Sequence, residues 1–163
     1  MFLQIAEWLE ATAPGVLVRE SLWAFPIVVG LHIIGLTLSI GVLMWFDLRL
    51  LGIAMRGCPV SRVYRRLMPF FASGFVVMFV TGGLLLSGFA TAAYGNVYFR
   101  VKMAAIALAG VNALAYHGFT ERRIADWDSA PRPPRAVRMA GLASLLLWTT
   151  AVLAGRMMSY TMF

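Results

Sequence analysis

The chain has 163 residues, of which 61% are hydrophobic and only 13% are charged. A water-soluble domain carries about twice that charged fraction, so the composition excludes an ordinary soluble protein and indicates an integral membrane protein. The net charge of +7 comes from arginines gathered in two short segments. This is typical of cytoplasmic loops, so we expect contact with a lipid bilayer and none with nucleic acid.

Residues 2–13 predict a short amphipathic helix, in which Gln4, Glu7 and Glu10 recur every three positions. A helix of that length cannot cross a bilayer, so we expect it to lie in the membrane interface. Pro14 and Gly15 should end it.

Residues 22–46 form an uncharged stretch of 25 residues with His32 near its middle. As a helix it would be about 37 Å long, enough to cross a hydrocarbon core of about 30 Å. Gly35 and Ser39 share a helical stripe with His32, which predicts that His32 faces a neighbouring helix. An ionisable ring at this depth is a functional candidate.

Three further spans are predicted at residues 67–89, 100–120 and 139–160. Pro69 should lie in the first turn of the second span, and small residues form faces on the spans. No acidic residue falls within the four predicted spans, which counts against proton-coupled transport.

The connecting segments 47–66 and 121–138 hold ten of the 14 basic residues. The positive-inside rule makes them cytoplasmic, so both termini should be extracytoplasmic in a bacterial inner membrane. The sequence thus predicts one all-α domain, residues 1–163, built as a four-helix transmembrane bundle with an N-terminal interfacial helix. Its small-residue faces would serve packing within one chain or in a homo-oligomer.

Polar side chains are predicted to gather in the extracytoplasmic half of the bundle, above or level with His32. Three cations above a buried imidazole suit an anionic ligand with a hydrophobic body, such as haem b with His32 as its axial ligand. A quinol or a tetrapyrrole substrate would also fit. Alternatively, the cations only extend to lipid headgroups and His32 is a structural hydrogen-bond donor. The candidate cofactor-binding residues besides His32 are Arg100, Lys102, Asn112, Arg156 and Tyr160.

His117 lies about 25 Å along its helix from Arg100, near the cytoplasmic surface, where Asp47 is a possible structural partner. The helical rise separates His32 from His117 by about 11–14 Å, which weakens the hypothesis that both bind one haem iron. A single His32-ligated haem, with Asn112, a methionine, water or an open site opposite, is more consistent with these depths. His117 remains a second candidate metal ligand.

Three methionines cluster at the outer end of the fourth predicted span. Thioethers are soft ligands for Cu(I), so together with His32 they raise copper as an alternative metal. Methionine is also a common apolar filler. The three are Met157, Met158 and Met162.

Short motifs along nearly the whole chain resemble an uncharacterised group of bacterial four-helix inner-membrane proteins, for which no activity is established. Besides His32, the motifs are R-E-S-L-W at 19–23, D-L-R-L-L-G at 47–52, Y-G-N-V-Y-F-R-V-K at 94–102, A-D-W-D at 125–128 and G-R at 155–156.

More distantly, the chain resembles the HemJ-type protoporphyrinogen oxidases and the CopD-like copper-resistance membrane proteins. In the HemJ type, which binds haem b, a histidine in an L-H-I-I context and a lysine at the start of helix 3 are functional. By position these look like His32 and Lys102, and Tyr116-His117 looks like the Tyr-His that closes helix 3 there. The chain differs in having Arg100 where that family tends to have histidine.

Four functions follow as hypotheses. The first is a haem b-binding redox protein that exchanges electrons with a periplasmic or membrane partner. The second is a protoporphyrinogen-oxidase-like tetrapyrrole enzyme, and the third is a copper-handling membrane protein. The fourth is a cofactor-free anchor that docks a periplasmic partner on its acidic N-terminal helix and outer loop.

Overall fold

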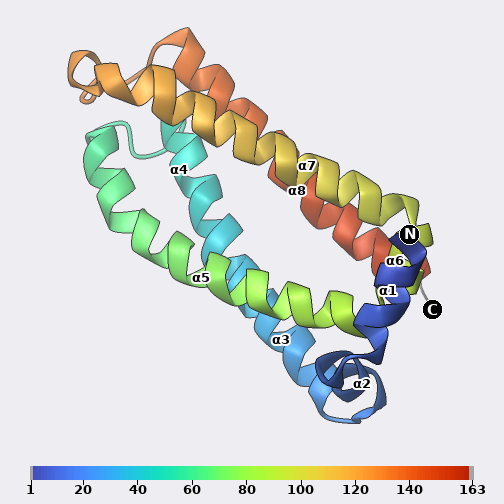
Figure 1. Ribbon diagram of the computed structural model, residues 1–163. Helices are drawn as coiled ribbons and strands as arrows, with labels where there is room; N and C mark the ends of the chain where they lie inside the picture. Colours follow the sequence, from blue (N-terminus) through green and yellow to red (C-terminus); the bar gives the residue numbers. More distant parts are fainter. Residues whose placement is uncertain (1, 162–163) are drawn as a thin grey trace.

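The computed structural model describes residues 2–161, apart from the side chains of residues 2 and 119–123. Four long helices run across the molecule as two hairpins (Figure 1). Within the described residues, each of the four is long and apolar enough to cross a membrane. This confirms the predicted all-α bundle and the architecture of a multi-pass membrane protein in contact with lipid.

The first long helix consists of α3 (Ala24–Leu36), a π-helical turn (Thr37–Gly41) and α4 (Val42–Leu50). The other three are α5 (Val60–Gly88), α7 (Val97–Ala115, continued by a π-helical turn at Tyr116–Thr120) and α8 (Arg135–Thr161). A short 3-10 helix (Glu121–Asp126) follows α7.

Two short helices precede the bundle, α1 (Phe2–Ala11) and α2 (Ala13–Glu20), where the sequence predicted one helix over 2–13. Thr12 marks the junction, since its hydroxyl donates to the Leu9 carbonyl at 2.6 Å and accepts from the Gly15 N–H at 3.4 Å. Pro14 lies in the first turn of α2, where its missing N–H costs no helical hydrogen bond. It therefore begins the second helix instead of ending the first.

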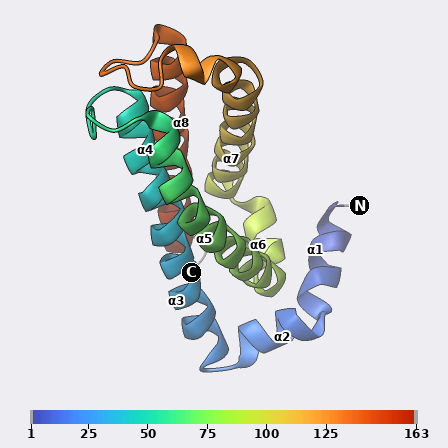
Figure 2. The same ribbon diagram turned by 90° about the vertical axis from the view of Figure 1, so that its left-hand side faces the viewer.

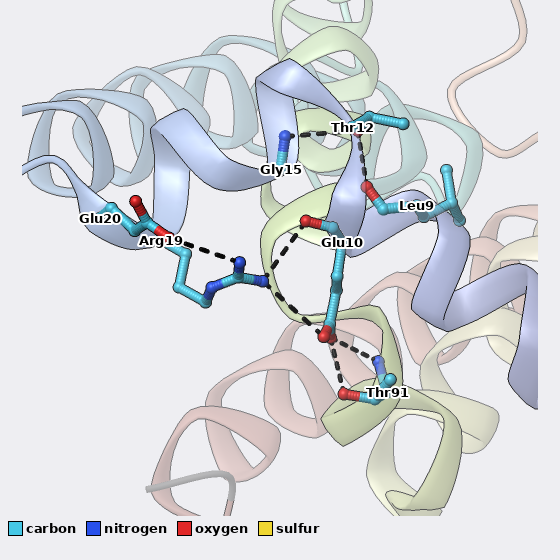
Figure 3. Close-up of polar contacts among 7 residues, drawn as sticks. All are labelled: Leu9, Glu10, Thr12, Gly15, Arg19, Glu20 and Thr91. Carbon is cyan, nitrogen blue, oxygen red and sulfur yellow. Dashed lines mark hydrogen bonds and ion pairs between the residues drawn. The ribbon is translucent and has the colours of Figure 1, made fainter.

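The N-terminal helices close one end of the bundle, with α2 against α5 and α1 against the short helix α6 (Ala90–Gly95) (Figure 2). The Glu10 carboxylate accepts hydrogen bonds from the Thr91 N–H at 2.7 Å and from the Thr91 hydroxyl at 2.6 Å (Figure 3). Arg19 lies 3.8 Å from that carboxylate and 3.7 Å from Glu20. Burial tends to raise the pKa of Glu10, but the Thr91 hydrogen bonds and the Arg19 charge outweigh it and hold the pKa below its usual value.

Three of the four long helices extend further at the arginine-rich end than the sequence predicted. The first continues to Leu50, α5 begins at Val60, and α8 begins at Arg135. Arginine is a good helix former, and its long side chain can extend the charge away from a helix end. The arginines of the segments predicted as loops can therefore lie within helices. As a result Pro69 lies in the interior of α5, which Figure 1 shows as a bowed helix, and not in its first turn.

The extension of the first helix also corrects the expectation that no acid lies within the spans. Asp47 belongs to α4 and is only 2% exposed.

Backbones approach closely where α3 crosses α5. A Cβ added at Gly74 would lie 2.6 Å from the backbone nitrogen of Ser39 and 2.8 Å from the carbonyl oxygen of Gly35. The predicted stripe of small residues beside His32 is thereby confirmed as a helix-packing surface. The second hairpin packs α7 against α8, and α8 also packs against α4.

Arg49 joins the two arginine-rich loops from a fully buried position in α4. Its Nε donates to the Cys58 carbonyl at 2.8 Å, and its Nη2 donates to the carbonyls of Ala130 at 3.1 Å and Asp128 at 3.5 Å. The Asp128 carboxylate caps the start of α5 by accepting from the N–H and the hydroxyl of Ser61. Burial tends to raise the pKa of Asp128, but the Ser61 hydrogen bonds and the Arg49 charge hold it below its usual value.

Candidate functional site

His32 lies on α3 with its ring against α5. Its Nδ1 is 2.9 Å from the Oγ1 of Thr81, and the Thr81 hydroxyl donates to the Val77 carbonyl at 2.6 Å. When the Thr81 hydroxyl donates to Val77, it accepts from His32, and this hydrogen bond is the one made by the tautomer with its ring proton on Nδ1. The Met78 carbonyl is a further partner of the ring, and it lies 3.3 Å from the same hydroxyl, on the Nδ1 side.

In this tautomer the Nε2 atom of His32 is unprotonated. The His32 ring also packs against Gly82 of α5. A Cβ added at Gly82 would lie 3.2 Å from the His32 Cε1. Thr81 and Gly82 were not singled out as partners of His32 from the sequence. The available signal was the one threonine of α5, which lies in the apolar part of that helix.

Lys102 lies on α7 and interacts electrostatically with the His32 imidazole. The Lys102 side chain packs against α8 at Gly155. A Cβ added at Gly155 would lie 3.7 Å from the lysine Cδ and 3.8 Å from its Nζ. The side chain is largely withdrawn from solvent in this position. The structure therefore brings together a histidine of the first hairpin and a lysine of the second.

The two outer arginines are exposed and have local partners. Arg100 donates to the Tyr94 carbonyl at 3.3 Å, and Arg156 donates to the Tyr160 hydroxyl at 2.9 Å. The Arg156 guanidinium also lies 4.7 Å from the centre of the Tyr160 ring, a cation–π contact one helical turn away. Both arginines lie at the end of the bundle opposite the arginine-rich loops, Arg100 near the start of α7 and Arg156 near the end of α8.

Asn112 is not grouped with His32. Its Nδ2 donates to the Ala140 carbonyl of α8 at 2.9 Å, and its side chain lines a cavity with His117 near the arginine-rich end. The predicted depth was wrong because α7 begins at Val97 and α3 at Ala24. Counted from these starts, Asn112 lies about 10 Å deeper than His32 by the helical rise.

The cavity has a volume of about 290 Å³ and is lined by residues of α4, α5, α7, the π-helical turn after α7, and α8. Asp47 and His117 both line it, and His117 makes edge-to-face contacts with Tyr64 at 5.9 Å and Tyr116 at 5.4 Å. Ser144 forms a hydrogen bond with the Asp47 carboxylate, whose Oδ2 has no partner. No pattern in the sequence predicts this cavity, because it arises from the packing of four helices.

The methionine cluster is only partly described. Met157 is exposed and Met158 is partly buried, whereas Met162 lies outside the described residues. Within the described part of the chain, no three side chains of His, Cys, Asp or Glu converge to hold a metal ion.

Over residues 6–161 the sequence matches a family described as a family of unknown function (DUF6644). No curated protein and no solved structure matches the chain.

Proposed function

We propose that this chain, which belongs to the DUF6644 family, is a haem b-binding redox protein of a bacterial inner membrane with His32 as an axial ligand. The single observation that carries the proposal is the hydrogen bond from His32 to Thr81. Metal-binding histidines commonly donate their second ring N–H to a fixed acceptor, which holds the tautomer and the orientation of the ring. The Thr81 hydroxyl is such an acceptor, and Nε2 is left available for iron.

The neighbouring cations support the same ligand. Lys102, close enough to act on the His32 ring, would pair with a propionate. Arg100 and Arg156 would serve the propionates from the outer end after exchanging their present contacts with Tyr94 and Tyr160. When bound, haem b supplies a one-electron change at its iron.

The orientation of the chain in the membrane belongs to the proposal. The two arginine-rich loops lie at one end of the bundle, while α1, α2 and α6 lie at the other (Figure 1). By the positive-inside rule the arginine-rich end is cytoplasmic. An electron-transfer partner in the periplasm or the membrane would then approach the outer end, nearest His32.

The test is a reduced-minus-oxidised visible spectrum of the purified protein in lipid nanodiscs, with haem and copper quantified on the same sample. We expect about one haem per chain in the wild type and in His117→Ala, and loss of haem in His32→Ala with the helix content of the wild type retained. Full haem retention by His32→Ala would overturn the ligand assignment. A wild type that takes up copper and no haem would favour copper handling instead.

Lys102 beside His32 also favours the second candidate, a tetrapyrrole-oxidising enzyme of the protoporphyrinogen-oxidase type. A buried lysine suits the carboxylates of a porphyrinogen as well as it suits haem propionates. Complementation of a bacterial strain lacking its own protoporphyrinogen oxidase separates the two functions. We expect growth with the wild-type gene and none with Lys102→Met if the enzyme hypothesis holds, and no growth with either if the protein only transfers electrons.

A further inference from the structure

The cavity between α4, α5, α7 and α8 has the features of a second binding site, separate from His32. His32 does not line it, and its volume of about 290 Å³ is at the lower end of the range of about 300–1,000 Å³ for small-molecule sites. Aromatic and aliphatic side chains form most of its wall. The aromatic ones outside the π-helical turn are Phe46, Tyr64, Phe71, Phe75 and Trp148.

Three polar groups line the cavity besides the tyrosines and His117, and two of them already have partners. Asn112 donates to the Ala140 carbonyl, and Ser144 is hydrogen-bonded to Asp47. Asp47 is 98% buried, yet its Oδ2 has no hydrogen-bond partner. A buried acceptor left without a donor costs free energy, so this oxygen indicates that a donor comes from a bound molecule.

The nearby cation does not satisfy Asp47. Arg49, two residues further along α4, donates to the loop carbonyls of Cys58, Ala130 and Asp128. The Asp47 carboxylate therefore faces the cavity with one free oxygen and only the Ser144 hydroxyl as a partner.

We propose that the cavity binds a bilayer-dissolved aromatic ring that carries hydroxyl groups, a head group of the quinol class, whose O–H donates to Asp47 Oδ2. The aromatic wall suits a flat ring. The volume accommodates a single ring with any isoprenoid tail outside. An uncharged donor is favoured over a cationic amine because the cavity is apolar and lies toward the arginine-rich end, where positive charge would repel an amine.

In this proposal the ligand enters from the lipid on the side between α5 and α7. Both helices line the cavity. In the described structure, however, α5 and α7 do not pack extensively against each other. Gly110 lies on this wall, with open space where a Cβ would be. A ligand dissolved in the bilayer can therefore enter without passing through the aqueous loops.

The test uses 2-decyl-1,4-benzohydroquinone under argon, with its dimethyl ether as a matched probe that has the same ring and no O–H donor. Binding to protein in lipid nanodiscs is followed by quenching of Trp148 fluorescence, with Trp148→Phe to identify the signal. We expect saturable binding of about one hydroquinone per chain. The dimethyl ether should bind at least 10-fold more weakly, as should the hydroquinone to Asp47→Asn, because each change removes the hydrogen bond from the ring hydroxyl to Asp47 Oδ2.

A steric variant keeps the test decisive if Asp47→Asn does not fold. Gly110→Phe should block the cavity, whereas Gly83→Phe, at another open glycine position outside the cavity, should bind the hydroquinone like the wild type. His32→Ala should also bind it normally, because this inference does not rest on haem.

Three outcomes would overturn the proposal. The first is hydroquinone uptake no greater than in protein-free nanodiscs. The second is equal affinity for the hydroquinone and its dimethyl ether. The third is tighter binding of 4-decylbenzylamine than of the hydroquinone, which would make the cavity a site for cations.

Discussion

His32 and Thr81 lie 49 residues apart in the sequence, and the Nδ1 of the ring is 2.9 Å from the threonine hydroxyl. The short threonine side chain reaches the ring because α3 and α5 cross closely at Gly35 and Gly74. The pair thus depends on two features at once, a backbone approach and a hydroxyl at the right turn of α5. It fixes which nitrogen of His32 is available to a ligand.

Removing the Thr81 hydroxyl should weaken haem binding without removing the ligand itself. We expect Thr81→Val, which is close in shape, to reduce haem affinity by about 10-fold or more, because partners of metal-binding histidines have effects of this size. Thr81→Ser keeps the hydroxyl and should retain haem. The measurement is haem per chain during titration of the apoprotein. Equal affinities in the wild type and Thr81→Val would show that the hydrogen bond does not position a ligand.

A methyl group at the α3–α5 crossing should destabilise the bundle. In Gly74→Ala the new Cβ would meet backbone atoms at under 3 Å, which a rotamer change cannot relieve. We expect a loss of about 1–3 kcal/mol in the free energy of unfolding, measured by denaturant titration in mixed micelles. Gly83→Ala, on the same helix with nothing within 4 Å of its Cβ position, is the matched control and should be neutral or stabilising.

Arg49 should be indispensable for stability, although it is one of the several arginines in the arginine-rich segments. Arg49→Ala leaves three carbonyl acceptors without their donor, and we expect it to cost about 3 kcal/mol or more. Arg49→Lys keeps the charge but lacks the planar fork, so it should rescue only part of the loss. The exposed Arg62 gives the charge-matched control: thermal unfolding of Arg62→Ala should resemble the wild type. Similar melting temperatures for Arg49→Ala and Arg62→Ala would contradict a structural role.

Acid should release α1 from α6. The pKa of Glu10 is lowered in the folded protein, so the carboxylate contributes stability that is fully present above its ordinary value of 4.5 and is lost as pH falls through the folded-state pKa. Hydrogen exchange at the Thr91 amide measures this directly. Protection should decline as pH falls below about 4.5, after correction for the intrinsic exchange rate, and should be low at every pH in Glu10→Gln. Glu7→Gln changes the same charge on an exposed site and should leave the protection profile unchanged.

Hydropathy and periodicity were sufficient to predict the four helices, because lipid requires each spanning segment to satisfy its own backbone. Helix ends were less predictable. Arg49 and Arg62 lie within helices, so charge alone did not mark where a loop begins. Thr12 and Pro14 divide the N-terminal segment by capping, a local effect that the amphipathic pattern of residues 2–13 does not reveal.

The site was predictable only in part. His32 stood out as an ionisable residue in an uncharged span, and its contact with a helix followed from the small residues beside it. The free oxygen of Asp47 was not foreseen, because its burial depends on where α4 ends and on the packing of α8. The depth of Asn112 was also missed, since a three-residue error at the start of α7 moves it by about one helical turn.

The buried guanidinium of Arg49 also sets an order of biogenesis. Two of its acceptors, the carbonyls of Asp128 and Ala130, are synthesised about 80 residues later, as is the carboxylate that caps α5 at Ser61. When the first hairpin emerges from the ribosome, its arginine-rich end therefore lacks these partners. It gains them only after α7 has been translated and the following loop has folded back. A truncation that ends after α6 would thus leave a hairpin in which Arg49 has lost two of its three carbonyl acceptors.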